Sequence, residues 1–264
     1  MKLYQVQALV IRTRVFNEAD RLVTLFSSEK GKLKAVARGA RRPRNRLSGS
    51  TGVFTYGKYS LFEGKSLENL SQAEVVVPFG DLRENLDKIA YASYFSELVD
   101  KTTEEGAPQK EIFTLLLESF YVIDTNINLA LAARAFEIRL LTVLGLKPVL
   151  DRCARCQRSF DPHKKEPVKM SPAMGGIVCP HCQNPKEDKM ITVSREALRQ
   201  LSDLIWKKWT ELVKIDPETK VNQDLDRMLQ ALLSFYIDDP IVSRTFLETV
   251  QMGSSHKKGA DFHE

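Results

Sequence analysis

The period of the hydrophobic pattern changes once along this chain, close to Pro78, and that change limits the folds open to it. Before it, five short runs alternate apolar and polar residues, as half-buried strands do. The runs span residues 4–13, 20–29, 31–39, 52–64 and 66–78. Five strands in about 75 residues predict a small closed barrel, with an OB-fold favoured and an SH3-like barrel as the alternative.

After Pro78, apolar residues recur at helical spacing. The pattern predicts helices over residues 82–98, 112–121, 128–144, 194–209 and 222–236, and a short one over 243–250. Residues 148–191 interrupt this pattern and contain all four cysteines. We therefore predict a multi-domain α+β protein: a barrel over 1–80, an all-α domain over 81–252 with an insertion at about 148–191, and a disordered tail over 253–264.

The four cysteines form two Cys-x-x-Cys pairs. They are Cys153, Cys156, Cys179 and Cys182. Each pair can present two thiolates to one tetrahedral ion, and four sulfur ligands leave no position for a reacting water. We therefore predict a structural Zn²⁺ site. A redox dithiol, four ordinary buried cysteines, and a zinc site in which His181 or His163 replaces one cysteine are the alternatives.

Positive charge is concentrated at the start of the chain. Residues 1–80 hold 14 Lys and Arg against 6 Asp and Glu, although the whole chain has a formal net charge of only +5. Residues 30–62 contain no acid at all. Such asymmetry favours a polyanion as partner, and nucleic acid rather than membrane, because no amphipathic basic helix accompanies it.

The third run places its basic side chains on one strand face and Leu33, Ala35 and Ala37 on the other, so we expect a solvated cationic face. In the fourth run, aromatic residues alternate beside a lysine, which suits base stacking as well as core packing. The candidate nucleic-acid contacts are Lys32, Lys34, Arg38, Arg41, Arg42, Arg44, Arg46, Tyr56 and Lys58. A solvated edge strand followed by a flexible loop is the plainer interpretation.

Catalytic patterns are missing from the sequence. It has no Gly-x-Ser-x-Gly or His-x-Glu element, and its four histidines lie near the cysteines or in the tail. We predict that the chain is not an enzyme; a metal-dependent nuclease would need scattered acids to converge. The first residues resemble neither a signal peptide nor a membrane span, so we expect a cytosolic protein without a membrane partner.

Four segments resemble the bacterial RecO family of recombination mediator proteins. They are FEIRLLTVLGLKPVLDRCARC at 136–156, SPAMGGIVCPHC at 171–182, AVARGARRPRNRL at 35–47 and SRTFL at 243–247. The resemblance extends over nearly the whole chain. It implies an OB-fold domain followed by a helical bundle and, because all four cysteines are kept, a zinc-bearing branch of the family.

The resemblance also implies a function in the repair and recombination of damaged DNA. Members of the family bind single- and double-stranded DNA, anneal complementary strands and act at the nucleoid. The implied partners are the C-terminal tail of the single-stranded-DNA-binding protein and RecR, with RecF and the RecA recombinase as further candidates. From the residues alone, an RNA-binding or ribosome-associated zinc protein remains the alternative function.

Overall fold

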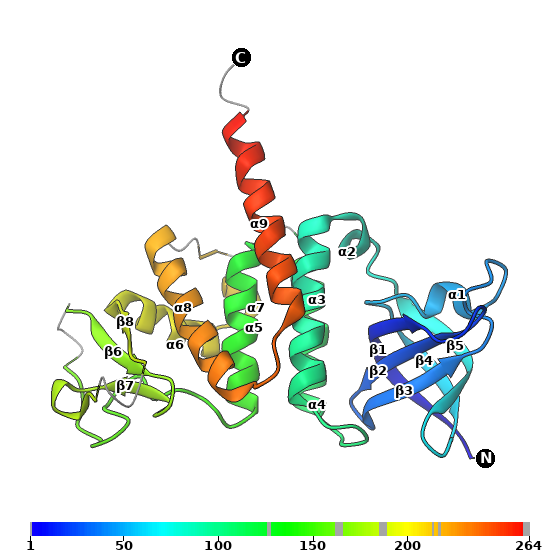
Figure 1. Cartoon of the computed structure of the whole chain (residues 1–264), viewed down its shortest axis with the longest axis horizontal. Coiled ribbons are helices and arrows are strands. Elements are labelled where there is room, and N and C mark those ends of the chain that lie inside the picture. The colour runs from blue at the N-terminus through cyan, green and yellow to red at the C-terminus, as the bar shows by residue number, and fades with distance from the viewer. Residues whose placement is uncertain are drawn as a thin grey trace. The chain divides into compact units, whose positions relative to one another are not determined.

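The structure is a computed structural model. It describes residues 2–125, 128–161, 166–184, 189–212, 214–215 and 218–260, with side chains as far as residue 252 (Figure 1). The chain divides into two compact units. The first unit comprises Met1–Asn126 and Ile241–Glu264, and the second unit comprises Ile127–Pro240. The first unit thus contains the predicted barrel together with helices from both sides of the second unit in sequence.

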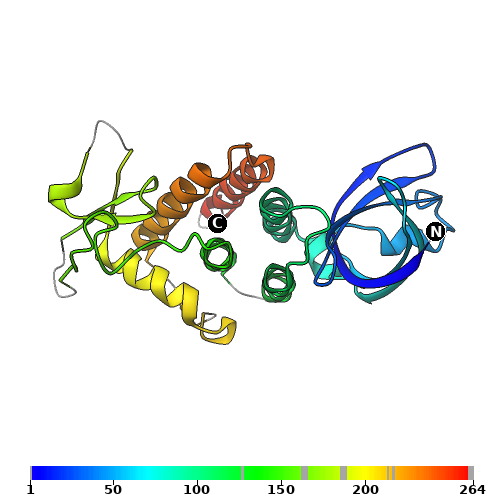
Figure 2. The ribbon, with the colours of Figure 1, turned by 90° about the horizontal axis from the view of Figure 1, so that it is seen from below.

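The five alternating runs form a closed barrel, as Figure 2 shows. The strands are β1 (Leu3–Val15), β2 (Arg21–Ser27), β3 (Gly31–Ala37), β4 (Tyr56–Phe62) and β5 (Glu68–Val77). They pair in the order β1-β2-β3-β5-β4, with β4 returning to β1 and only β3 and β5 parallel. A short helix, α1 (Leu47–Ser50), lies between β3 and β4 in sequence. This arrangement confirms the prediction of an OB-like barrel.

Alternate residues of each strand fill the barrel, as the period of two requires. The buried cluster contains Val6, Ala8, Val10, Val23, Leu25, Leu33, Ala35, Ala37, Tyr59, Leu61 and Leu70. Tyr59 is fully buried, and its hydroxyl donates a hydrogen bond to the Ser50 carbonyl at 3.0 Å. Burial also raises the pKa of Tyr59. The fourth run therefore turns Tyr59 and Leu61 inward and leaves Tyr56 and Lys58 on the outer face.

Four helices complete the first unit: α2 (Gly80–Glu84), α3 (Leu86–Thr102), α4 (Lys110–Asp124) and α9 (Val242–Ala260). Helix α3 packs against both α4 and α9. The Glu97 carboxylate accepts hydrogen bonds from the backbone N–H groups of Val242 and Ser243, at 3.1 and 2.6 Å, which fixes the start of α9. The helix continues to Ala260, past the predicted end at residue 250; disorder remains a prediction only for residues 261–264, which lie outside the described residues.

The second unit combines helices with a small sheet. Its helices are α5 (Leu129–Val143), α6 (Arg195–Trp206), α7 (Trp209–Leu212) and α8 (Thr219–Tyr236). Helix α5 packs against α6 and α8. The strands β6 (Val168–Ser171), β7 (Gly176–Val178) and β8 (Ile191–Val193) form a sheet in the order β7-β6-β8. Ser194 caps α6: its hydroxyl accepts a hydrogen bond from the Ala197 N–H at 3.3 Å.

Candidate nucleic-acid interface and metal centre

The arginine segment, residues 38–46, leaves the end of β3 and rests on the loop between β1 and β2. Gly39 turns the chain with a φ of +68°, a left-handed conformation that glycine adopts without strain. Its N–H donates a hydrogen bond to the Asp20 carboxylate at 2.8 Å, and the Arg41 N–H donates to the Ala19 carbonyl at 3.0 Å. These bonds hold the segment in a defined conformation at one end of the barrel.

Four exposed side chains of this segment form no ion pair with any acid of the described residues. They are Arg38, Arg42, Arg44 and Arg46. All four are exposed, and none lies within 4.0 Å of a carboxylate of the described residues. The remaining arginine, Arg41, donates to the carbonyls of Asn17 and Glu18 at 3.2 and 2.7 Å, which ties the two loops together. We call the four exposed side chains the arginine rim.

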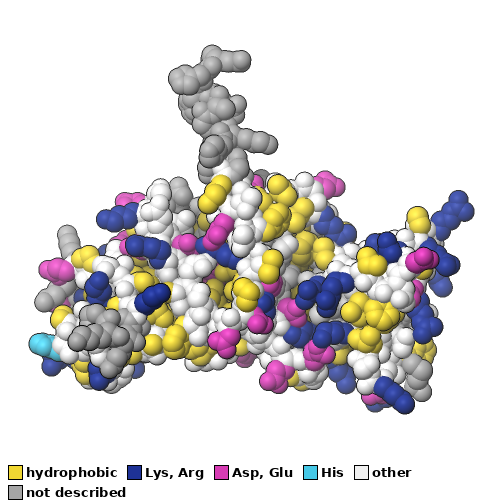
Figure 3. Space-filling view, in the orientation of Figure 1, with side chains coloured by type: hydrophobic (Ala, Val, Ile, Leu, Met, Phe, Trp, Pro, Cys, Tyr) yellow, Lys and Arg dark blue, Asp and Glu magenta, His cyan; other side chains and the backbone are white. Residues whose placement is uncertain are grey.

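The pKa of Asp20 is affected by charges of the arginine rim. Its pKa is lowered first by the Gly39 N–H, then by the Asn17 amide, and further by the charges of Arg38 and Arg42. Because this one carboxylate interacts with only Arg38 and Arg42 of the rim, the rim stays strongly cationic. Figure 3 shows Lys and Arg side chains around the barrel on the face that it draws.

A pocket of about 630 Å³ opens between the arginine segment and β5. Its lining residues are Arg38, Arg44, Asn45, Arg46, Leu47, Leu70, Ser71, Gln72 and Ala73. None of these is acidic, and three are members of the arginine rim. The pocket therefore offers an anionic ligand guanidinium groups on one side, with Ser71 and Gln72 as polar side chains on the other.

The prediction that the basic face of β3 is solvated is wrong at Lys32 and Lys34, because both lysines pack against the helical part of the first unit. Lys32 is only 8% exposed, and its Nζ lies 3.0 Å from the Asp100 carboxylate at the end of α3. Lys34 forms an ion pair with Glu105, in the loop between α3 and α4. Acids from the helical part of the first unit thus neutralise both ammonium groups. Burial and the ion pair weigh against the predicted nucleic-acid contact of Lys32, because a phosphate would have to displace Asp100 from a buried ammonium.

The two outer residues of β4 also have partners within the first unit. The half-buried Tyr56 ring lies 6.2 Å from that of Phe113 in α4, and its hydroxyl donates to the Gln7 side chain at 2.7 Å. Lys58 stands opposite Glu74 in the β4–β5 register, 3.5 Å from its carboxylate. Phe113 of α4 thus contacts the ring that base stacking would use, whereas the half-exposed Lys58 keeps only a weak surface ion pair.

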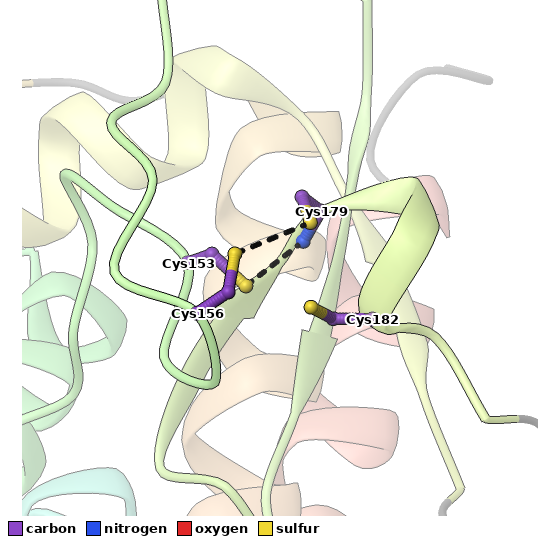
Figure 4. Close-up of side chains that lie close together, drawn as sticks. All are labelled: Cys153, Cys156, Cys179 and Cys182. Carbon is purple, nitrogen blue, oxygen red and sulfur yellow. Dashed lines mark hydrogen bonds between the residues drawn. The ribbon is translucent and has the colours of Figure 1, made fainter.

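The four cysteines converge in the second unit, as Figure 4 shows. Their sulfurs all lie within 4.8 Å of one another, and the Sγ atoms of Cys156 and Cys179 are 3.8 Å apart. A tetrahedral zinc site with Zn–S bonds of about 2.3 Å places its sulfurs about 3.8 Å apart. The same separation is far longer than a disulfide bond, and all four thiols are free. The residues present therefore fit a four-sulfur zinc site.

Backbone pairing between residues distant in sequence brings the two cysteine pairs together. The N–H of Val149 donates to the Gly175 carbonyl, and the N–H of Ile177 donates to the Val149 carbonyl, both at 2.9 Å. Gly176 allows this approach, because a Cβ there would lie 2.5 Å from the Val149 oxygen. The pairing fixes the loop of the first cysteine pair beside β7, which leads into the second.

The local hydrogen bonds favour a thiolate at Cys153. Burial raises the pKa of this thiol, but the backbone N–H groups of Cys156, Cys179 and Arg155 outweigh it and lower the pKa to about 6. Among the described residues, the cluster consists of the cysteines alone; His181 is exposed and not a member, and His163 lies outside the described residues. No histidine replaces a cysteine within the part of the chain that the structure describes.

Fold and site together define an α+β protein of the OB-barrel class, with a cationic rim on the barrel and a cysteine cluster suited to a metal. The chain belongs to the RecO family of DNA repair proteins. Residues 1–79 match the family model described as "Recombination protein O N terminal", and residues 83–245 match "Recombination protein O C terminal". Membership of this family agrees with the prediction that the chain is not an enzyme.

Relatives named "DNA repair protein RecO" match the chain over nearly its full length. The protein of Symbiobacterium thermophilum is 37% identical over 254 residues, which cover 95% of this chain and 99% of the relative. That of Pelotomaculum thermopropionicum is 33% identical over 265 residues, covering 99% and 100%. Among the described helices, none combines the length and the apolar content that crossing a membrane requires.

Proposed function

We propose that this chain is a recombination mediator, which binds single- and double-stranded DNA, anneals complementary strands and helps to load the RecA recombinase onto DNA coated with single-strand-binding protein. One observation carries the DNA-binding part of the proposal. The arginine rim presents four guanidinium groups that pair with no carboxylate in the described part of the chain, beside a pocket that no acidic residue lines. Phosphate is the anion that such groups bind bidentately.

Annealing by this surface needs no covalent chemistry. Two DNA strands repel each other through their phosphates, and a protein that neutralises part of that charge lets complementary bases meet. The arginine rim supplies the neutralising charge, while Arg41 and Gly39 hold the segment in place. Because Lys32 and Lys34 are already paired with acids, the rim neutralises most of the phosphate charge, and Lys58 contributes less.

Family membership supports the remaining parts of the proposal. The partners are RecR, the C-terminal tail of the single-strand-binding protein, and RecF and RecA in the same process, in the cytoplasm at the nucleoid. A Zn²⁺ ion held by the four cysteines has a structural role, because four sulfur ligands leave no coordination position for a substrate. Cys153, Cys156, Cys179 and Cys182 would bind the ion, and the ion would cross-link the two loops that carry them.

The test is an annealing assay with complementary strands that are coated beforehand with their binding protein. We expect the wild-type chain to accelerate duplex formation, and R38A/R42A/R44A/R46A to lose most of this acceleration. The matched control K34A removes a cation that Glu105 already neutralises, so it should anneal like wild type. Full annealing by the quadruple variant would refute the proposal. Preference for structured RNA over single-stranded DNA in a competition would favour an RNA-binding protein instead.

A further inference from the structure

The second unit carries a tryptophan that is far more exposed than its size would lead one to expect. Trp206, the last residue of α6, is 70% exposed. Helix α6 buries Leu198, Leu201 and Leu204, and the helical period turns Trp206 away from that buried face. A large aromatic surface left in water has no role in the core, and such residues are typical of binding sites.

One cation lies over this indole, and two more follow it in the sequence. The Nζ of Lys147 lies 4.5 Å from the Trp206 ring centroid, and Lys207 and Lys208 follow Trp206 directly in sequence. Lys207 pairs with Asp203 at 2.8 Å. By contrast, the ammonium groups of Lys147 and Lys208 have no carboxylate within 4.0 Å among the described residues, and both side chains are exposed.

The backbone that carries Trp206 is fixed by a second cation and the second tryptophan. Arg139 of α5 donates through Nε to the Leu204 carbonyl at 2.8 Å and also donates to the Lys207 carbonyl. Its guanidinium carbon lies 4.2 Å from the Trp209 ring centroid. These contacts hold the turn between α6 and α7, so Trp206 projects from a rigid support and loses little entropy when it binds a ligand.

We propose that Trp206, with Lys147 and Lys208, is a second contact site for single-stranded nucleic acid. A base stacks on the open face of the indole, and the two ammonium groups face the neighbouring phosphates. A nucleic-acid strand fits better than an apolar partner because the Lys147 ammonium, which has no carboxylate partner among the described residues, lies over an exposed, flat aromatic face. This inference rests on the proposed annealing function, since annealing requires the protein to hold two strands.

Intrinsic fluorescence tests this site directly, because the chain has only two tryptophans. The variant W209F leaves Trp206 as the only indole. We expect titration of the full-length W209F chain with a short oligothymidylate to quench the Trp206 emission in a saturable way. The further substitution K147A should weaken the apparent affinity several-fold. An unchanged emission at saturating oligonucleotide would overturn the proposal.

Substitutions of Trp206 itself give the second measurement. In the R38A/R42A/R44A/R46A background, W206A should lower the remaining affinity for the oligothymidylate about tenfold, and W206F should restore most of it, because stacking needs an aromatic ring. The control F235A removes another exposed aromatic side chain of the second unit and should change nothing. An equal loss in F235A and W206A would overturn the site.

The outcomes separate this inference from the proposed function. If the barrel does not bind DNA, the quadruple variant will bind and anneal like wild type, whatever happens at Trp206. If the Trp206 site is wrong, the quadruple variant will lose annealing while the emission of W209F stays constant. Quenching by an acidic peptide with an apolar end, without quenching by oligothymidylate, would assign Trp206 to a protein partner and overturn the nucleic-acid site.

Discussion

Removing the arginine rim should change how DNA affinity depends on salt, by an amount that the structure predicts. Each phosphate neutralised on duplex DNA contributes about 0.9 to the slope of log affinity against log salt concentration, and each on a single strand about 0.7. Four guanidinium groups that form no ion pair with the carboxylates that the structure describes therefore account for a slope of about 3.6 on duplex and about 2.8 on a single strand.

Between 50 and 200 mM salt, a slope difference of about 3.6 corresponds to roughly 150-fold in affinity, and one of about 2.8 to roughly 50-fold. The advantage of wild type over R38A/R42A/R44A/R46A should shrink by these factors across that range. Fluorescence anisotropy with labelled duplex and single-stranded oligonucleotides, at five or more salt concentrations, measures both slopes.

The double variant K34A/K58A is the matched control. Glu105 already neutralises Lys34, and Glu74 partly neutralises Lys58, so their removal releases few additional counter-ions. Its slope should differ from that of wild type by less than about 1. A quadruple variant with an unchanged slope, or a lysine double variant with the larger loss, would refute the reasoning that unpaired charge on the rim binds the phosphates.

Three further predictions concern stability and metal. The purified chain should contain one zinc per molecule by elemental analysis, and C156A or chelation should destabilise the second unit, with a contribution on the order of 10 kcal/mol from the metal. The variant D100N leaves the Lys32 ammonium buried without its charge partner and should cost about 3 kcal/mol in urea unfolding, whereas K32M should cost less. The folded-state pKa of Asp20 lies below its unfolded value, so its stabilising contribution is present above about pH 4 and is lost as the pH falls through the folded pKa; D20N should flatten the acid limb of stability against pH.

The sequence predicts the barrel well because period-two alternation directly records which side chains face the core. The predicted run 31–39 corresponds to β3, and the run 66–78 to β5, within two residues at each end. The prediction for the fourth run is wrong at its start, because β4 begins only at Tyr56. Residues 52–55 are not strand, since Phe54 adopts a φ of +65° and its ring packs against Phe120. A tertiary contact of this kind leaves no local signal.

The same limit explains which site residues were predicted. The arginine rim could be predicted from residues 38–46 alone, because this segment contains no acid that could neutralise its arginines. The pairing of Lys32 with Asp100 joins positions 68 residues apart, so alternation alone could not reveal it. The cysteine cluster could be predicted because each Cys-x-x-Cys pair has the spacing of two ligands of one metal ion, although the backbone pairing that joins the two pairs could not. Trp206 was missed because the helical pattern was extended to Trp209, while α6 ends at Trp206.

Arginine-selective modification with phenylglyoxal, read by mass spectrometry with and without saturating single-stranded DNA, tests the central claim most directly. Bound phosphates should protect Arg38, Arg42, Arg44 and Arg46 from the reagent. Arg155 of the second unit, also exposed and without a carboxylate partner among the described residues, should react at the same rate in both samples. Equal modification of the rim with and without DNA would contradict the assignment of this end of the barrel to the phosphate backbone.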